Sequence, residues 1–203
     1  MKRVYWFLLG AVCFILAQPL LRLPILAKLQ QSTGFMLAYT LNPLTVGIVI
    51  ALSAGVFEEG FRFLFKRFLL KPDKCMFMQP LLFGLGHGFA EALILLVPAF
   101  MTAPVSQLGL ALMERTLAIV LHVTLTVVVW NGFQKRRRIL YLLAAVAIHG
   151  FADALIPVLS QLSNSVLLIE ASLAVIDVLM VVYTVHSKKY YIKRGNENEK
   201  ISI

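Results

Sequence analysis

Ionisable residues stand inside strongly apolar stretches of this sequence. Such a side chain in the middle of a membrane span costs about 2.5–3.5 kcal/mol on insertion scales, so several of them together indicate a function. The candidates are glutamates, histidines and their charged neighbours: Glu58, Glu59, Arg62, His87, Glu91, His122, His149 and Asp153. Carboxylates and imidazoles that meet can accept a proton from water and stabilise an oxyanion, and they can also ligate zinc.

The elements that must position these residues are apolar segments long enough to cross a bilayer. Hydrophobic residues make up 60% of the 203 residues, charged residues 14%, and the mean hydropathy is +0.84. A soluble domain has about a quarter of its residues charged, so lipid must replace water around much of this chain. Spans of about 20 apolar residues are expected, and six segments qualify: about 4–21, 36–65, 79–101, 105–133, 139–160 and 165–187. We predict an all-α, polytopic bundle of six transmembrane helices over residues 1–187 and a basic tail over 188–203.

Four of these segments place a polar group at a similar depth. Counted at about 1.5 Å per residue from the basic end of each helix, Glu58 and His87 lie about 12 Å deep, His149 about 15 Å and His122 about 18 Å. Taken singly, each group has a structural explanation, as an interfacial salt bridge or an interhelical hydrogen bond. Three histidines and a glutamate pair in one layer favour a joint site.

Helical spacing gives several of these groups a charged neighbour on the same helix. The i,i+4 pairs are Glu58–Arg62, His87–Glu91 and His149–Asp153. The second member of each pair could orient or neutralise the first. Glycines at 84, 86 and 88 surround His87 and would let a neighbouring helix approach it closely.

The loop charges predict the orientation. Most basic residues lie on one side: Lys2, Arg3, Lys66, Arg67, Lys71, Lys74, Lys135, Arg136, Arg137, Arg138, Lys188, Lys189, Lys193, Arg194 and Lys200. The opposite side has only Arg22 and Lys28, whose side chains we expect to snorkel to the interface. The basic side of a multi-pass cell-membrane protein faces the cytoplasm, so both termini are predicted to be cytoplasmic. This topology accounts for the net charge of +9 without a nucleic-acid partner.

Four motifs occur in order on separate predicted helices. They are Glu-Glu-Gly-Phe-Arg at 58–62, Phe-Gly-Leu-Gly-His-Gly-Phe-Ala-Glu at 83–91, Glu114-Arg115 with His122, and His-Gly-Phe-Ala-Asp at 149–153. Together they resemble the YhfC-type intramembrane peptidases, relatives of the CPBP group that includes CAAX prenyl proteases and bacteriocin-processing or immunity proteins. The resemblance covers about half of the chain.

The resemblance implies a glutamate-type hydrolase. Glu58 or Glu59 would activate water together with His87, while His149 and Asp153 would occupy the motif that helps to hold the oxyanion. The first motif is one residue shorter than the EExxxR of the wider group, which leaves both glutamates as candidates for the base. Asp153 stands where an asparagine is common, and its carboxylate would orient His149 rather than donate to an oxyanion.

We predict an intramembrane endopeptidase that acts on a membrane-associated peptide or protein without a cofactor, through a site that opens toward the cytoplasmic half. His122 is an additional donor or ligand.

The first alternative is a zinc-dependent protease on the same residues, because three histidines and a glutamate suffice for a catalytic zinc site, although no HExxH motif is present. A non-enzymatic membrane immunity or binding protein is a second. A proton or ion translocator is a third, but its polar path should cross both leaflets, and the outer half here is largely apolar.

Overall fold

The computed structural model describes residues 2–70 and 73–192, and this part of the chain is helical. The α-helices are α1 (Lys2–Ala17), α2 (Leu23–Gln30), α3 (Thr33–Leu41), α4 (Pro43–Leu64), α5 (Met78–Thr102), α6 (Gly109–Gln134), α7 (Arg138–Leu159) and α8 (Ser165–Ser187). Single π-helical turns follow α1 (Gln18–Arg22) and α4 (Phe65–Leu69), and short 3-10 turns cover Val105–Gln107 and Lys188–Tyr190. Four of the basic residues used for the orientation lie outside the described residues, namely Lys71, Lys193, Arg194 and Lys200.

Six helical stretches are long and apolar enough to cross a membrane. They are Arg3–Gln30, Pro43–Leu69, Met78–Thr102, Gly109–Gln134, Arg138–Leu159 and Ser165–Tyr190. The predicted all-α, six-span, multi-pass fold is therefore confirmed. The side of the membrane on which the termini lie stays a prediction.

The first span is longer than the sequence indicated. It passes Pro19 and Pro24 and ends at Gln30 rather than near residue 21. Proline removes a backbone hydrogen bond and usually kinks or ends a helix. Here the N–H of Leu23 donates to the carbonyl of Gln18, five residues back, so one π turn absorbs the disruption and the helix continues.

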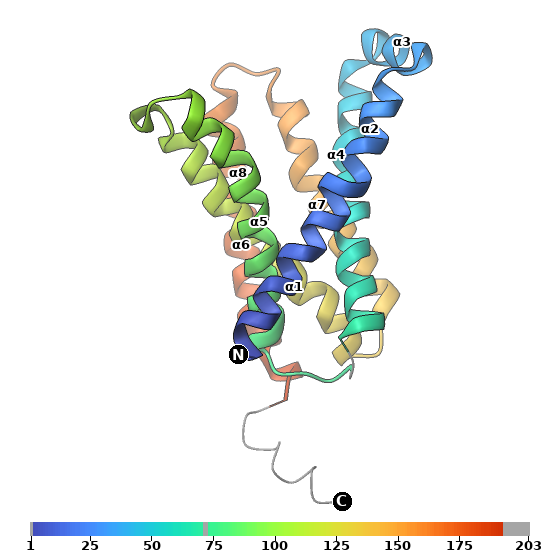
Figure 1. Cartoon of the computed structure of the whole chain (residues 1–203), viewed down its shortest axis with the longest axis vertical. Coiled ribbons are helices and arrows are strands. Elements are labelled where there is room, and N and C mark those ends of the chain that lie inside the picture. The colour runs from blue at the N-terminus through green and yellow to red at the C-terminus, as the bar shows by residue number, and fades with distance from the viewer. Residues whose placement is uncertain (1, 71–72, 193–203) are drawn as a thin grey trace, which may run out of the picture.

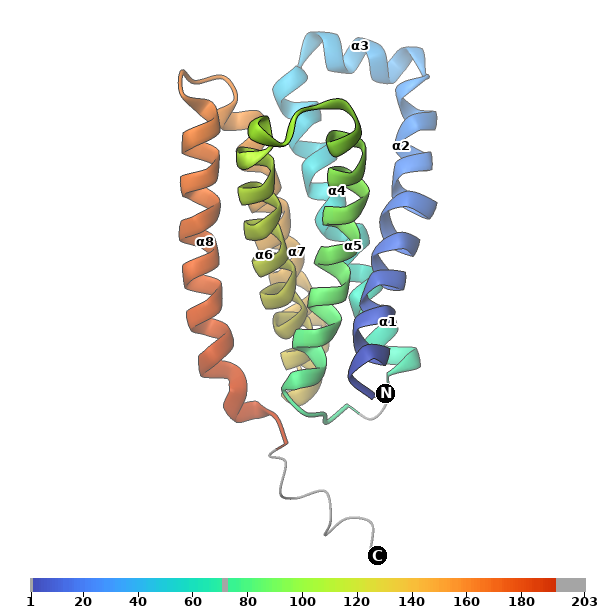
Figure 2. The same cartoon turned by 60° about the vertical axis from the view of Figure 1, so that its left-hand side comes forward.

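The second span is shorter than predicted because residues 33–41 form a separate helix. The side chain of Ser32 caps α3 by accepting a hydrogen bond from the N–H of Phe35 at 3.2 Å, and Asn42 separates α3 from α4. Figure 2 shows α3 lying across the top of the bundle, between the ends of α2 and α4.

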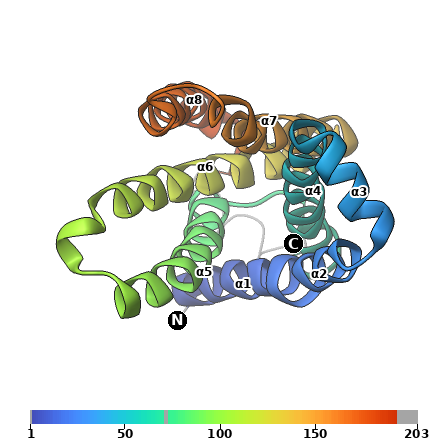
Figure 3. The same cartoon turned by 90° about the horizontal axis from the view of Figure 1, so that it is seen from above.

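The bundle is packed at one end and open at the other. Helix α1 packs on α5, α5 on α6, α6 on α7 and α8, and α4 on α7. At the end with the basic loops, a core of large side chains includes the fully buried Trp130, Phe133 and Phe83. Toward the other end, α5 and α6 diverge from α2 and α4 (Figures 1 and 3). The N-terminal half of α6 contributes no buried residue before Leu121, whereas all residues from Leu125 to Gln134 are buried.

Glycines allow the close contacts around α5. A Cβ at Gly84 would lie 2.6 Å from the Cα of Val123 on α6, and a Cβ at Gly86 would collide with the backbone carbonyl of Phe7 on α1. These glycines thus face two different helices and let both approach the helix that carries His87, as the sequence predicted.

The start of the predicted basic tail packs against the bundle. The N–H of Ile192 donates to the carbonyl of Cys75 at 3.1 Å, and Tyr191 is buried. Cys75 itself is buried against Gln134, and burial raises the pKa of its thiol to about 11. Cys75 therefore stays a neutral thiol at physiological pH and belongs to the packed end.

Candidate metal centre

The two adjacent glutamates of α4 have different surroundings. Glu58 borders a cavity. Its Oε2 lies 2.8 Å from Nε2 of His87, and its Oε1 accepts a hydrogen bond from Nε2 of Gln18 at 2.5 Å. Glu59 is completely buried and is not among the residues that line the cavity. Successive residues of a helix point about 100° apart, so the two glutamates face different neighbours.

Each of two imidazoles is held by a carboxylate on one nitrogen and turns the other toward Glu58. His149 Nδ1 lies 2.8 Å from Oε1 of Glu59, which leaves its Nε2 4.0 Å from Oε1 of Glu58. His122 Nε2 contacts Oε2 of Glu91, which leaves its Nδ1 3.6 Å from Oε2 of Glu58. A carboxylate behind an imidazole fixes the tautomer and the ring orientation.

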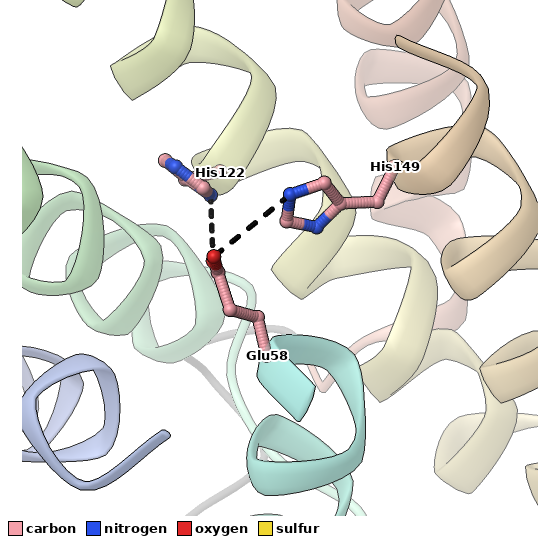
Figure 4. A group of neighbouring side chains, drawn as sticks. All are labelled: Glu58, His122 and His149. Atoms are coloured by element: carbon pink, nitrogen blue, oxygen red, sulfur yellow. Dashed lines mark ion pairs between the residues drawn. The ribbon is translucent and has the colours of Figure 1, made fainter. Parts of the chain in front are cut away.

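Glu58, His122 and His149 form a compact group of potential metal ligands. One ligand atom of each residue lies within 4.8 Å of the other two, and all three residues are buried. Figure 4 shows that they come from three different helices and converge on the Glu58 carboxylate. Buried histidine nitrogens and a carboxylate are ligands that zinc prefers.

Arg62 links the parts of this group. Its guanidinium contacts Oε1 of Glu59, lies 2.7 Å from Nδ1 of His122 and 3.6 Å from Oε2 of Glu58, and is completely buried. The predicted Glu58–Arg62 pair is thus present. The arginine also places a positive charge between two carboxylates that would otherwise repel each other.

His87 and Asp153 each contact one member of the ligand group, Glu58 and His149 respectively. His87 is completely buried behind Glu58, and its Nδ1 has no hydrogen-bond partner among the described residues. Asp153 is 32% exposed and lines the cavity, with Oδ2 3.6 Å from Nε2 of His149, as the i,i+4 spacing predicted. The predicted His87–Glu91 pair does not form, because Glu91 turns to His122 and Arg115 on α6.

The cavity beside this group has a volume of about 420 Å³. Residues from Gly47 to Glu58 line it on α4, and Glu91, Leu95 and residues from Glu114 to His122 line it on α5 and α6. All of these residues lie at the ligand group or on the side of it away from the basic loops. The site was expected to open toward the half with the basic loops, which is predicted to be cytoplasmic. The cavity instead lies away from those loops, because the aromatic core fills that half and the helices diverge in the other.

Two polar residues of the site come from the first span and were missed. Gln18 donates to Glu58, and Arg22 donates to Oε1 of Gln18 at 3.0 Å and to the carbonyl of Ile50 at 2.7 Å. The expectation that Arg22 snorkels is wrong, since the π turn continues the helix and directs Arg22 into the cavity. The polar pair within an apolar, proline-containing segment was the available signal.

Asp177 of α8 also lines the cavity. Its side chain is buried, and its Oδ2 has no hydrogen-bond partner among the described residues. Asp177 was not among the predicted site residues, because the sequence does not tell which face of α8 meets the bundle.

A family model described as YhfC intramembrane metalloprotease matches residues 2–103 and 96–181. The chain belongs to the YhfC intramembrane metalloprotease family. This confirms the resemblance found in the motifs and extends it to most of the chain, including α1 and most of α8. Comparisons with curated proteins and with solved structures gave no match.

Membership of the YhfC family bears on the choice between the predicted mechanisms. It supports an intramembrane protease, which acts on protein substrates. The description as a metalloprotease, together with the buried Glu58, His122 and His149, favours the zinc-dependent alternative over the cofactor-free glutamate mechanism predicted first.

Proposed function

We propose that this YhfC-family protein is a zinc-dependent intramembrane endopeptidase whose metal is held by Glu58, His122 and His149. The observation that carries the proposal is the convergence of three buried ligand atoms, one from each residue, within 4.8 Å of one another. Three protein ligands leave one position of a tetrahedral zinc ion for water or substrate, which is the usual composition of a catalytic zinc site.

The hydrogen bonds of the ligand group can accommodate a metal. Zinc binds the neutral form of histidine. His149 can donate its Nδ1 proton to Glu59, and His122 can donate its Nε2 proton to Glu91, so that each ring would keep a lone pair on the nitrogen that faces Glu58. With these tautomers both imidazoles would be suited to bind a metal ion.

Arg62 and a bound metal ion would compete for one nitrogen. The lone pair on His122 Nδ1 could serve either the Arg62 guanidinium, 2.7 Å away, or a metal ion. The contacts of Arg62 with Glu58 and Glu59 would still hold it beside the site. From there a fixed positive charge can stabilise the negative charge that develops on the oxygen of the attacked peptide carbonyl.

Of the remaining groups, Asp153 can transfer protons and His87 can position Glu58. Bound zinc lowers the pKa of the water that it holds and polarises a carbonyl. Asp153 lies on the cavity side and is partly exposed, so its carboxylate can accept a proton from the attacking water and return it to the leaving nitrogen. His87 supports Glu58 from behind through its 2.8 Å contact and acts as a positioning residue.

The substrate class follows from the walls of the cavity. The ligand group and Asp153 line one part of the cavity, while Leu95, Leu117, Ile156 and Leu173 line other parts. An extended peptide with apolar side chains could lie against these leucines and Ile156 with one carbonyl at the ligand group. We therefore propose membrane-associated peptides or proteins as substrates, reached from the open, non-basic half of the bundle.

The test is the turnover of membrane peptides by purified variants. Glu58→Gln, His122→Ala and His149→Ala should each lower turnover at least about 10²-fold, the scale on which an activated water contributes. His186→Ala is the matched control, because His186 is an exposed histidine on α8 outside the cavity. Folded yield is measured in parallel, and near-normal turnover of all three folded variants would refute the proposed site.

A further inference from the structure

A second and larger cavity lies at the end of the bundle with the basic loops. Its volume is about 1030 Å³, and it lies among the start of α1, residues 76–82 and residues 185–192 at the end of α8. This end of the molecule is at the bottom of Figure 2, where the lower ends of α1, α5 and α8 lie. Helix α3 lies at the opposite end. None of the residues that line the second cavity lines the first.

The walls of this cavity combine two kinds of chemistry. Trp6, Leu82 and Val185 contribute apolar surface. Arg3, Lys188 and Lys189 contribute positive charge and are exposed, and no described residue that lines the cavity is acidic. An apolar wall beside a cluster of cations matches a ligand that has hydrocarbon chains and an anionic headgroup.

The cationic side is held in place by the chain segment that follows α8. The backbone N–H of Ile192 donates a hydrogen bond to the carbonyl of Cys75, and the ring of Tyr191 packs edge-on against Phe77 with centroids 5.2 Å apart. The hydroxyl of Tyr191 donates to the carbonyl of Val127 at 3.4 Å. These contacts hold the backbone that carries Lys188 and Lys189 beside the cavity.

The cavity is also accessible from the lipid. Val185 and Met78, on two of its walls, are 65% and 50% exposed. Both lie in helices that are long and apolar enough to cross a membrane, so an acyl chain could enter from the side. A basic pocket between transmembrane helices at the cytoplasmic interface is the environment in which anionic headgroups bind.

We propose that this cavity binds an anionic phospholipid from the leaflet next to the basic loops. The acyl chains lie against Trp6, Leu82 and Val185, and the phosphate lies among Arg3, Lys188 and Lys189. The apolar walls distinguish this ligand from a free phosphate, which would leave them empty.

Competitive lipid binding to the purified full-length protein tests the charge requirement. Native mass spectrometry in a mild detergent compares phosphatidylglycerol with phosphatidylcholine of identical acyl chains. Since each basic residue near an anionic headgroup contributes roughly a fivefold preference, the wild type should prefer phosphatidylglycerol by at least about fivefold. The triple variant Arg3→Gln, Lys188→Gln, Lys189→Gln should lose this preference.

The matched control removes the same charge elsewhere on that face of the protein. The triple variant Arg67→Gln, Arg136→Gln, Arg137→Gln changes exposed residues that do not line the cavity, and it should keep the preference. Equal losses in both triple variants would mean general attraction to the basic face and would overturn the proposal. Displacement of the lipid by an equal concentration of glycerol phosphate would indicate a site for the headgroup alone and would also overturn it.

Photo-crosslinking identifies the occupant directly. A benzophenone amino acid at Leu82, inside the cavity, is compared with one at Leu179, which is 65% exposed on α8 and lines neither cavity. In mixed bilayers, Leu82 should give phosphatidylglycerol adducts enriched at least about fivefold over those at Leu179, which is the preference that a single cation provides. Equal lipid ratios at both positions, or crosslinks from Leu82 to residues 193–203 or to a second copy of the chain, would show that another occupant fills the cavity.

Discussion

At the scale of single residues, the carboxylates of the proposed site divide into one candidate ligand and its supports. Glu58 faces the cavity, whereas Glu59 and Glu91 each hold the far nitrogen of an imidazole. Supporting carboxylates of this kind commonly change metal affinity by 10–100-fold when they are replaced. The proposed metal site therefore depends on residues that do not touch the metal.

Substitutions of Glu91 and Glu114 give a matched test of this dependence. Both contact Arg115, but only Glu91 also contacts His122. Glu91→Gln should weaken zinc binding about 10–100-fold, because the tautomer and orientation of His122 are then less well fixed. Glu114→Gln should leave the affinity within about threefold, well short of that loss. Zinc affinity is measured by competition with a chromophoric chelator, and equal effects of the two variants would assign the loss to Arg115 instead.

The residue types of the site could be predicted from the sequence, but most of their partners could not. The cost of placing charge in lipid marks Glu58, His87, His122 and His149 without any structure. Which atom meets which depends on the rotation of each helix about its axis. A pattern along one helix does not contain that rotation, and Glu91 therefore meets α6 rather than His87 on its own helix.

At the scale of elements, the π turn after α1 and the glycines of α5 bring the site together. The π turn directs Gln18 and Arg22 into the cavity, and the glycines let α1 and α6 approach α5 closely. The glycine contacts could be foreseen from their density around His87. The π turn could not, because two prolines in an apolar segment more often indicate a helix end.

Two glycine substitutions test the close contact between α1 and α5. Gly86→Ala places a Cβ against the backbone of Phe7 and should destabilise the protein by about 1–3 kcal/mol, the usual cost of overpacking. Gly60→Ala is the control, since nothing lies within 4 Å of a Cβ at that position and alanine favours a helix. Unfolding in detergent by a graded denaturant measures both. A stable Gly86→Ala protein would contradict the close approach of the two helices.

At the scale of the whole molecule, the bundle closes at its basic end and opens at the other. Six spans and their apolar character followed from composition and segment length, which need no tertiary information. The direction in which the cavity opens could not be predicted in this way, because it depends on where large side chains such as Trp130 and Phe133 fill the space between helices. If the basic end is cytoplasmic, substrates would reach the proposed metal site from the opposite half.

Reporter fusions test this orientation. A reporter inserted at Arg136 should report the cytoplasm, because that loop is exposed and strongly basic. One inserted at Ser163, in the exposed turn before α8, should report the opposite side. The same location for both would place α7 outside the membrane and contradict the six-span topology.

The metal content of the purified protein tests the central claim most directly. Zinc is measured by mass spectrometry in the wild type, in His149→Ala and in His186→Ala, together with peptide turnover before and after treatment with a chelator. The account predicts about one zinc ion per chain in the wild type and His186→Ala, as expected for a single four-coordinate site, and little in His149→Ala. It also predicts that chelation abolishes turnover and that added zinc restores it. Full turnover in protein stripped of metal would contradict the account and would indicate that the glutamates activate water without a metal.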